Sequence, residues 1–372
     1  MKKILLVFGT RPEAIKLCPL VKELKKQADK FKTIVCVTAQ HREMLDQVLN
    51  IFDVVPDYDL DLMKNDQTLF DITCSCLTEI GNVIKKEKPN IVIVQGDTTT
   101  TFVTSLAAYY HQVMIGHVEA GLRTGNKYSP FPEEINRKIT TVIADIHFAP
   151  TQKNKNNLLL EAIPEDKIVV TGNTVIDALL WIREKIRTER KEYQELSNID
   201  FQNKIILVTG HRRENFGRDF INICQALREI AIRHSNIEIV YPVHLNPNVR
   251  KPVFNVLSGI NNVKLIEPLG YEPFVYLMDR SYFIISDSGG VQEEAPSLGK
   301  PVLVTRNTTE RPEAVEAGTV KLVGADMETI VSEAERLLGD HRYYSQMSGI
   351  QNPYGDGYAC EKIVSALAEY LK

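Results

Sequence analysis

Two acidic residues follow apolar strands in the first half of the sequence. Residues 91–95 read Ile-Val-Ile-Val-Gln and lead to Asp97, while the apolar residues 113–118 lead directly to Glu119. Continuous apolar runs of this length are typical of parallel strands that are buried on both faces. The residues that follow such strands gather at one edge of the sheet, where doubly wound proteins bind their ligands. Asp97 and Glu119 are therefore candidates for proton transfer at that edge.

A third acid and an imidazole extend this set. Glu133 opens a predicted helix after two prolines, and Arg137 lies four residues further along the same helical face. Taken alone, this spacing is better explained by an ion pair between the two side chains than by catalysis. His211 follows a strand predicted at residues 205–209, so we expect it at the carboxyl edge of a second sheet.

A glycine pair marks a candidate phosphate site. Residues 283–286 form an apolar strand, and Ser288, Gly289 and Gly290 follow just before a helical pattern opens at residue 291. Glycines let backbone N–H groups approach an anion, and the positive end of a helix dipole attracts it. Glu294, one turn into the helix, can accept hydrogen bonds from sugar hydroxyls. A glycine-rich turn without a ligand explains these residues equally well when they are considered alone.

Cations occupy further strand-to-helix turns. Arg11 and Lys16 follow the strand expected at residues 4–8, and Arg311 opens a helix after the strand expected at residues 302–305. Surface salt bridges are one explanation, but a cation inside such a turn more often meets an anion. With the glycine pair, these cations suit a diphosphate, and a nucleotide-sugar is the natural ligand for the whole set.

The order of elements predicts the fold class. Strands alternate with helices throughout the 372 residues, which indicates an α/β protein with doubly wound parallel sheets. The length suits two domains. We expect an N-terminal Rossmann-like domain at residues 1–172, completed by a C-terminal helix at 360–372. A C-terminal nucleotide-binding domain at 173–359 follows, with a cleft between the two.

Composition and absent motifs exclude several classes of function. A formal net charge of -4 argues against nucleic acid or a membrane surface as a partner, and no apolar run reaches the length of a membrane span. The six cysteines lack metal-site and disulfide spacing, so we expect reduced thiols, a cytoplasmic protein and no metal. Nicotinamide, P-loop and zinc-protease motifs are also missing. We therefore expect side-chain chemistry without a cofactor.

Ten motifs together resemble a known family along essentially the whole chain. The chain is similar to the bacterial non-hydrolysing UDP-N-acetylglucosamine 2-epimerases. The resemblance is carried by G-T-R-P-E-A-I-K, T-A-Q-H-R-E-M-L-D-Q, G-D-T-T-T-T, H-V-E-A-G-L-R-T, S-P-x-P-E-E-x-N-R, T-G-N-T-V-I-D, H-R-R-E-N-F-G-R, V-H-L-N-P, D-S-G-G-V-Q-E-E-A-P-S-L-G-K-P and T-E-R-P-E-A.

This resemblance implies a glycosyltransferase-B fold, a homodimer and the interconversion of UDP-GlcNAc and UDP-ManNAc, which supplies ManNAc to surface polysaccharides. A proton on C2 of the sugar has no adjacent carbonyl, so its removal alone is unfavourable. Expulsion of UDP from C1 in the same step removes that obstacle. We therefore expect elimination to UDP and 2-acetamidoglucal, followed by re-addition with protonation of the opposite face.

The resemblance also assigns roles to matching positions. Asp97, Glu119, Glu133 and His211 match the catalytic groups. Leu269 stands where some relatives have a polar residue near the uracil, so only its backbone is expected to contact substrate. Glu43, which is glutamine in part of the family, falls in a region that binds a second, activating UDP-GlcNAc. The substrate-binding matches are Arg11, Lys16, Arg137, Leu269, Phe274, Ser288, Gly289, Gly290, Glu294 and Arg311, and the allosteric matches are Gln40, Glu43, Arg212 and His244.

Three other functions stay open at this stage. A hydrolysing 2-epimerase releases free ManNAc, because water captures the intermediate. A glycosyltransferase of the same fold leaves UDP-GlcNAc unchanged when no acceptor is present. A catalytically silent nucleotide-sugar sensor binds without turnover. The sequence does not assign the base and the acid among the carboxylates.

Overall fold

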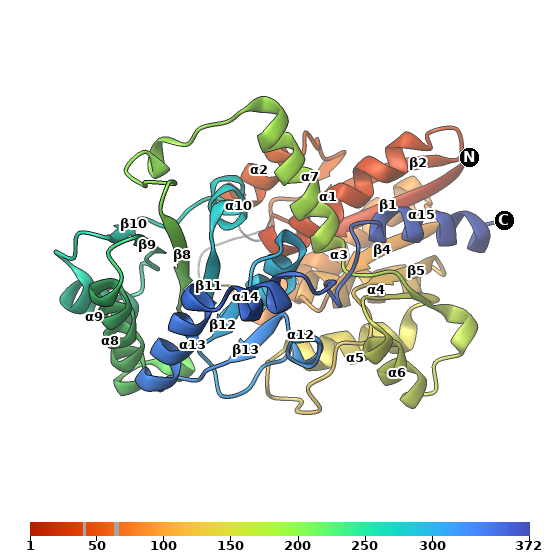
Figure 1. Cartoon of the computed structure of the whole chain (residues 1–372). Helices are drawn as coiled ribbons and strands as arrows, with labels where there is room; N and C mark the ends of the chain where they lie inside the picture. The colour runs from red at the N-terminus through yellow and green to blue at the C-terminus, as the bar shows by residue number, and fades with distance from the viewer. Residues whose placement is uncertain (40–41, 63–66) are drawn as a thin grey trace. The chain divides into compact units, whose positions relative to one another are not determined.

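The computed structural model describes residues 1–39, 42–62 and 67–372. Its chain divides into two compact units. The first comprises Met1–Ala178 together with Tyr354–Lys372, and the second comprises Leu179–Pro353. Each unit is built on one parallel sheet covered by helices (Figure 1).

The sheet of the first unit has seven strands in the order β3-β2-β1-β4-β5-β6-β7. All pairs are parallel, and the strand order reverses between β1 and β4, as in a Rossmann sheet. The apolar runs of the sequence form its central strands, because a parallel sheet is buried on both faces. The strands are β1 (Lys2–Phe8), β2 (Phe31–Val37), β3 (Tyr58–Asp59), β4 (Ile91–Gln95), β5 (Met114–Val118), β6 (Ile146–Ala149) and β7 (Ile168–Val170).

Four helices of the first unit begin at a threonine whose side chain caps the helix. The Thr10 side chain caps α1 by accepting from the Glu13 N–H. The Glu13 carboxylate in turn accepts a hydrogen bond from the Thr10 N–H, which completes a capping box. The helices of this unit are α1 (Arg11–Lys26), α2 (Arg42–Ile51), α3 (Leu69–Glu87), α4 (Thr99–Tyr110), α5 (Glu133–Ile143), α6 (Gln152–Leu160) and α15 (Ala359–Tyr370), with a 3-10 turn η1 at Glu165–Lys167.

The C-terminal helix belongs to the first unit. In Figure 1, α15 lies beside α1, although the two helices come from opposite ends of the chain. Asp177 on helix α7 (Thr174–Glu189) accepts hydrogen bonds from the backbone N–H groups of Ala359 at 3.2 Å and Cys360 at 2.7 Å. A carboxylate at this helix start also interacts favourably with the dipole. Helix α7 continues into the second unit after Ala178.

The second unit repeats the architecture with six strands. Their order is β10-β9-β8-β11-β12-β13, all parallel, with the reversal between β8 and β11. The strands are β8 (Lys204–Thr209), β9 (Ile237–Pro242), β10 (Val263–Ile266), β11 (Phe283–Ser286), β12 (Val302–Val304) and β13 (Val320–Leu322).

The longer helices on the second sheet bury apolar faces. Residues of α8, α9 and α13 form one core cluster with β8, β9 and β11. The helices are α8 (Arg218–Arg233), α9 (Pro247–Leu257), α10 (Tyr271–Arg280), α11 (Gly289–Glu294), α12 (Pro312–Ala317), α13 (Met327–Gly339) and α14 (His341–Ser348), with 3-10 turns η2 (Gln194–Leu196), η3 (Arg213–Asn215) and η4 (Ala295–Leu298).

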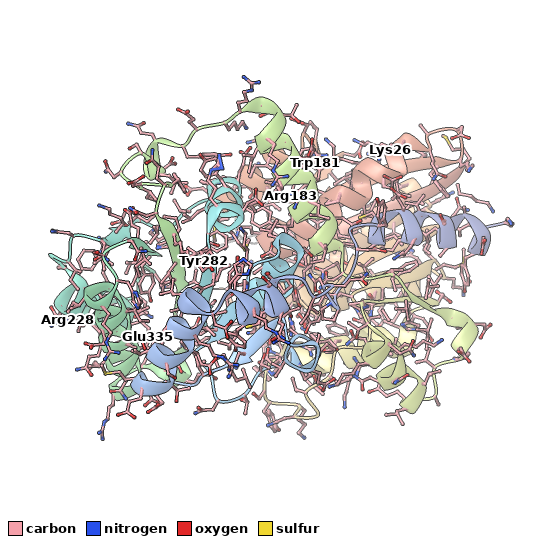
Figure 2. The ribbon with its side chains drawn as sticks, viewed as in Figure 1. Lys26, Trp181, Arg183, Arg228, Tyr282 and Glu335 are labelled. Carbon is pink, nitrogen blue, oxygen red and sulfur yellow. The ribbon has the colours of Figure 1, made fainter. Side chains whose placement is uncertain are left out.

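Aromatic stacking supports the edge of this core. Tyr282, just before β11, stacks on Tyr344 with ring centroids 4.2 Å apart, and the Lys204 ammonium lies 4.2 Å from the Tyr282 centroid. Figure 2 labels Tyr282, together with Arg228 on α8 and Glu335 on the neighbouring helix α13. Such stacked and cation–π contacts each contribute about 0.5–1.5 kcal/mol beyond simple burial.

Two further findings concern the described residues as a whole. All six cysteines are free, and burial raises the pKa of the Cys18, Cys36 and Cys224 thiols to about 12. None of the helices in the described part of the chain is long and apolar enough to span a bilayer.

Candidate functional site

The carboxyl ends of β1, β4 and β5 surround a cavity in the first unit. These strands are neighbours in the sheet, so the turns that follow them meet at one edge. The cavity has a volume of about 390 Å³. Arg11, Lys16, Asp97 and Glu119 all line it. The structure thus brings together four of the residues that the sequence placed at the ends of three different strands.

Asp97 is held by the helix that begins at Glu133. Arg137 Nη2 donates a hydrogen bond of 2.6 Å to Asp97 Oδ2, and Asn136 Nδ2 donates one of 3.0 Å to the Asp97 carbonyl. Burial raises the pKa of Asp97 to about 6, while the Arg137 charge opposes that rise and the Glu119 charge adds to it. A carboxyl group with this pKa exchanges a proton readily near neutral pH.

Glu119 occupies a strained position at the end of β5. Its backbone φ is +65°, a conformation that residues other than glycine adopt rarely and at a cost of about 1–3 kcal/mol. Three side chains hold its carboxylate: Lys16 Nζ at 2.6 Å from Oε1, Asn173 Nδ2 at 3.1 Å from Oε1, and Gln95 through Oε2. The Lys16 ammonium thus forms an ion pair with Glu119, in addition to any contact that it makes with a diphosphate.

The spacing of Glu133 and Arg137 predicted an ion pair between them, and this prediction is wrong. Arg137 instead pairs with Asp97 and, at 3.3 Å, with Glu134. In the described part of the chain, Glu133 Oε2 is buried without a hydrogen-bond partner. Its charge also contributes to the raised pKa of Asp97, so Glu133 is electrostatically coupled to the cavity.

The glycine corner of the second unit differs from the predicted turn. Helix α11 begins at Gly289 rather than at residue 291, with Ser288 as its N-cap in an extended conformation. Gly289 and Gly290 are therefore the first helical residues, and the early N–H groups of the helix belong to them. A Cβ built on Gly289 would lie 3.9 Å from Arg212 Nη2 and 3.9 Å from Arg311 Nη2, so two guanidinium groups lie near this corner.

Further side chains are fixed around the same corner. Arg311 pairs with Glu293, and Tyr271 donates a hydrogen bond of 2.5 Å from its hydroxyl to Glu294 Oε1. Phe274 lies in the first turn of α10, and Leu269 lies in the loop that precedes this helix. Candidate ribose, diphosphate and base contacts therefore come from adjacent segments of one unit.

His211 follows β8 and lies against two other strand ends. Its ring stacks on His244 with centroids 5.4 Å apart and an angle of 16° between the planes. Its Nδ1 is 3.6 Å from Oδ1 of the buried Asp287. Burial lowers the pKa of His211, Asp287 opposes that shift, and His244 and Arg212 reinforce it.

The predicted residues divide between the two units. Gln40 lies outside the described residues, and Glu43 lies in the first turn of α2. The first unit contains Arg11, Lys16, Glu43, Asp97, Glu119, Glu133 and Arg137, and the second contains His211, Arg212, His244, Leu269, Phe274, Ser288, Gly289, Gly290, Glu294 and Arg311.

Four supporting residues were missed by the sequence reasoning: Glu13, Gln95, Asn173 and Asp287. Each is a polar side chain that contacts an element distant in sequence. Glu13 and Asp287 lie in the motifs that include Arg11 and Ser288, Asn173 lies in the motif T-G-N-T-V-I-D, and Gln95 directly precedes the motif that includes Asp97. These positions were the available signal, because a buried polar residue needs a partner. Within the described ranges, no group of three histidine, cysteine or acidic side chains is arranged to hold a metal ion.

The two Rossmann-like sheets and their charged strand ends define an α/β protein of the glycosyltransferase-B class, as the sequence predicted. The sequence model of the family described as UDP-N-acetylglucosamine 2-epimerase matches residues 22–368. The chain belongs to this UDP-N-acetylglucosamine 2-epimerase family, which confirms the resemblance.

Similar proteins match the chain over its full length. The probable UDP-N-acetylglucosamine 2-epimerase of Ralstonia solanacearum is 58% identical and covers 100% of both chains. The UDP-N-acetylglucosamine 2-epimerase of Escherichia coli K12 is 58% identical over 98% of both. The crystal structure of the Neisseria meningitidis UDP-GlcNAc 2-epimerase bound to UDP-GlcNAc superposes with a TM-score of 0.90 at 54% identity, covering 99% of this chain and 100% of that one.

Proposed function

We propose that this protein reversibly epimerises UDP-GlcNAc at C2 to give UDP-ManNAc. The observation that carries the proposal is full-length identity of 58% to named UDP-N-acetylglucosamine 2-epimerases. The solved relative from Neisseria meningitidis, bound to UDP-GlcNAc, supports the choice of substrate. The cavity of the first unit supports the choice of chemistry, because it combines the carboxylates of Asp97 and Glu119 with two cations.

The proposed reaction is an elimination followed by a re-addition. A carboxylate removes the proton from C2 while the bond between C1 and the phosphate oxygen breaks, and UDP leaves with that electron pair. The phosphate oxygen then attacks C1 of 2-acetamidoglucal, and a carboxylic acid delivers a proton to the other face of C2. Atoms and electrons balance over the cycle, so neither a redox cofactor nor water is consumed.

We assign the proton transfers to Asp97, Glu119 and Glu133 as a set. The pKa of about 6 for Asp97 supports this assignment, since both protonation states are accessible near neutrality. The ion pair of Glu119 with Lys16 favours its charged form. Arg11 and Lys16 would stabilise negative charge as the diphosphate departs, and Arg137 would hold Asp97 in place.

We assign uridine diphosphate binding to the second unit. The first N–H groups of α11, preceded by Ser288, would contact phosphate oxygens, with Arg311 beside them. Glu294, oriented by Tyr271, would accept from the ribose hydroxyls. Phe274 and the backbone of Leu269 would contact the base. His211 would contact the reacting sugar or its phosphate.

We also propose that the protein is a homodimer. The packed helices α3, α4 and α5 expose large apolar side chains, including Phe70, Tyr109, Tyr110 and Val142. Exposed apolar surface of this kind is typical of protein interfaces. Light scattering after gel filtration should give twice the 42.1 kDa mass of one chain, and Val142→Glu should reduce it.

Regulation and cellular role complete the proposal. A second UDP-GlcNAc would activate the enzyme through Glu43, Arg212, His244 and Gln40; sigmoidal kinetics with UDP-GlcNAc support this, and hyperbolic curves contradict it. The six free cysteines support a reducing, cytoplasmic location. There the product would supply ManNAc for surface polysaccharides.

Product analysis tests the proposed function. Purified protein is incubated with UDP-GlcNAc, and the sugar region is followed by NMR. The proposal predicts an equilibrium mixture of UDP-GlcNAc and UDP-ManNAc, approached from either side. Free ManNAc with UDP would identify a hydrolysing enzyme, and unchanged UDP-GlcNAc would favour an acceptor-dependent transferase or a sensor.

A further inference from the structure

The buried side chain of Asp287 joins two loops of the second unit. It follows β11 directly, precedes Ser288, and is 0% exposed. Its Oδ2 accepts hydrogen bonds from the backbone N–H groups of His211 at 2.9 Å and Arg212 at 2.8 Å. A buried carboxylate requires such bonds, and bonds to a charged acceptor are the stronger ones. Asp287 therefore ties the loop after β8 to the glycine corner after β11.

The second oxygen of the same carboxylate has a different role. Asp287 Oδ1 is buried without a hydrogen-bond partner in the described part of the chain, and it lies 3.6 Å from His211 Nδ1. This separation is just beyond a hydrogen bond, so a small rotation of the imidazole completes the contact. An unsatisfied buried acceptor is costly, which favours that rotation and a proton on Nδ1.

The other groups around His211 oppose its protonation. His244, from the loop after β9, stacks on the imidazole, and Arg212 follows it in the chain. Both lower the pKa of His211, as does burial, whereas Asp287 raises it. Asp287 is thus the one charge among these three neighbours that favours the imidazolium form.

We propose that Asp287 is a positioning residue for the epimerisation, which fixes the His211 imidazole with Nδ1 toward the carboxylate and Nε2 toward substrate. This inference rests on the proposed function, in which His211 contacts the substrate. Through one carboxylate, the orientation of the imidazole is linked to the corner formed by Ser288, Gly289 and Gly290.

Asp287→Asn separates positioning from a structural role. Asparagine keeps the shape of the side chain and one oxygen that can accept from both backbone N–H groups, but it removes the negative charge beside Nδ1. A structural role alone predicts nearly wild-type behaviour. A positioning role predicts a change at His211 itself. The matched control is Asp177→Asn, because Asp177 is also buried and also accepts from two backbone N–H groups, of Ala359 and Cys360.

The primary measurement is an NMR titration of His211 in the full-length protein, assigned with His211→Gln. Asp287→Asn should lower the pKa of His211 by roughly one unit, since it removes an opposite charge within about 4–6 Å. It should also lower kcat by about 10-fold or more with little change in KM. Asp177→Asn should change neither quantity. Asp287→Asn with an unchanged His211 pKa and unchanged kcat would overturn the proposal.

A second measurement uses the unmodified protein and so does not depend on a variant folding. The ¹⁵N shifts of neutral His211 report its tautomer, and the proposal predicts the Nδ1–H form; the Nε2–H form contradicts it. Both NMR tests are independent of turnover. If the wild type fails to epimerise UDP-GlcNAc, the proposed function fails, whereas the titration and tautomer still decide whether Asp287 controls His211.

Discussion

The guanidinium of Arg137 lies 2.6 Å from the carboxylate of Asp97, and it joins the start of α5 to the end of β4. The side chain of Arg137 is 5% exposed, so water screens this ion pair weakly. Burial raises the pKa of Asp97 and the guanidinium lowers it. The contact therefore lowers the pH at which Asp97 becomes charged, against the larger effect of burial.

Arg137→Met should move the acid limb of the pH profile upward. If ionised Asp97 is required, kcat/KM of the wild type falls as the pH drops through about 6. Loss of the guanidinium removes an effect that lowers this pKa, so the limb should shift by about one unit or more toward higher pH. Rates of UDP-ManNAc formation from pH 5 to 9 measure it. Arg123→Met, which removes a partner of Glu161 in the same unit, is the control; an acid limb that moves downward in Arg137→Met contradicts the assignment.

The same raised pKa has a consequence for stability. The folded value of about 6 lies above the ordinary 3.8, so protonated Asp97 stabilises the fold below about pH 4. That contribution is lost as the pH rises through about 6. The free energy of unfolding of the Asp97→Asn variant should therefore depend less on pH in this range than that of the wild type. Urea unfolding of both proteins at pH 4.5 and 7.5 measures the difference; equal pH dependence in the two rules out the linkage.

Glu119→Gln should abolish most turnover while the fold is retained. Glutamine preserves the shape at this strained position, but it cannot transfer a proton and no longer pairs with Lys16. We expect kcat to fall by about 10²-fold or more. Glu161→Gln provides the matched control, since it removes another carboxylate of this unit that pairs with an arginine. Retention of full activity by Glu119→Gln would exclude this residue from the chemistry.

Gly121→Ala should destabilise the first unit far more than Gly125→Ala. Both glycines have positive φ, of +91° and +77°. A Cβ at Gly121 would lie 2.3 Å from the backbone oxygen of Asn154, whereas one at Gly125 meets nothing within 4 Å. We expect the free energy of unfolding to fall by about 3 kcal/mol or more in Gly121→Ala and by about 1–2 kcal/mol in Gly125→Ala. Urea unfolding of the two variants measures both decreases in stability. Similar decreases would show that the close approach to Asn154 is unimportant.

Glu13→Ala should weaken the corner between β1 and α1. Glu13 accepts hydrogen bonds from the N–H of Gly9, from the N–H and hydroxyl of Thr10, and from the hydroxyls of Thr98 and Thr101. Its removal leaves several donors unpaired, so the free energy of unfolding should fall by at least about 3 kcal/mol. Asp46→Ala, which removes an exposed partner of Arg42, should cost less than about 1 kcal/mol. Equal effects of the two changes would contradict the role of Glu13.

Hydrophobic pattern was sufficient to predict the strands that carry the site. The predicted bounds at residues 91–95 and 283–286 match β4 and β11, and those at 113–118 and 205–209 each differ by one residue from β5 and β8. These segments are short apolar runs buried on both faces, and the turns after them are punctuated by glycine and polar residues. Strand β3 (Tyr58–Asp59) has no such run, because it pairs at a sheet edge and only through two residues.

Contacts between side chains that are distant in the sequence could not be predicted from the sequence. Local spacing joined Arg137 to Glu133, yet the sheet places Asp97 closer, and a buried guanidinium pairs with the nearest carboxylate that the fold provides. Likewise, Lys16 was expected to meet a diphosphate, but the neighbouring ends of β4 and β5 bring Glu119 to it. Such contacts depend on strand order, which periodicity does not specify.

Isotope exchange at C2 tests the central proposal most directly. UDP-GlcNAc is incubated with the protein in deuterated water, and the recovered UDP-sugars are analysed by NMR and mass spectrometry. The proposal predicts that UDP-ManNAc and, at equilibrium, UDP-GlcNAc both carry deuterium at C2, with UDP still attached. UDP-ManNAc that retains protium at C2, or a UDP-GlcNAc pool that never exchanges, would contradict an elimination and re-addition by these carboxylates.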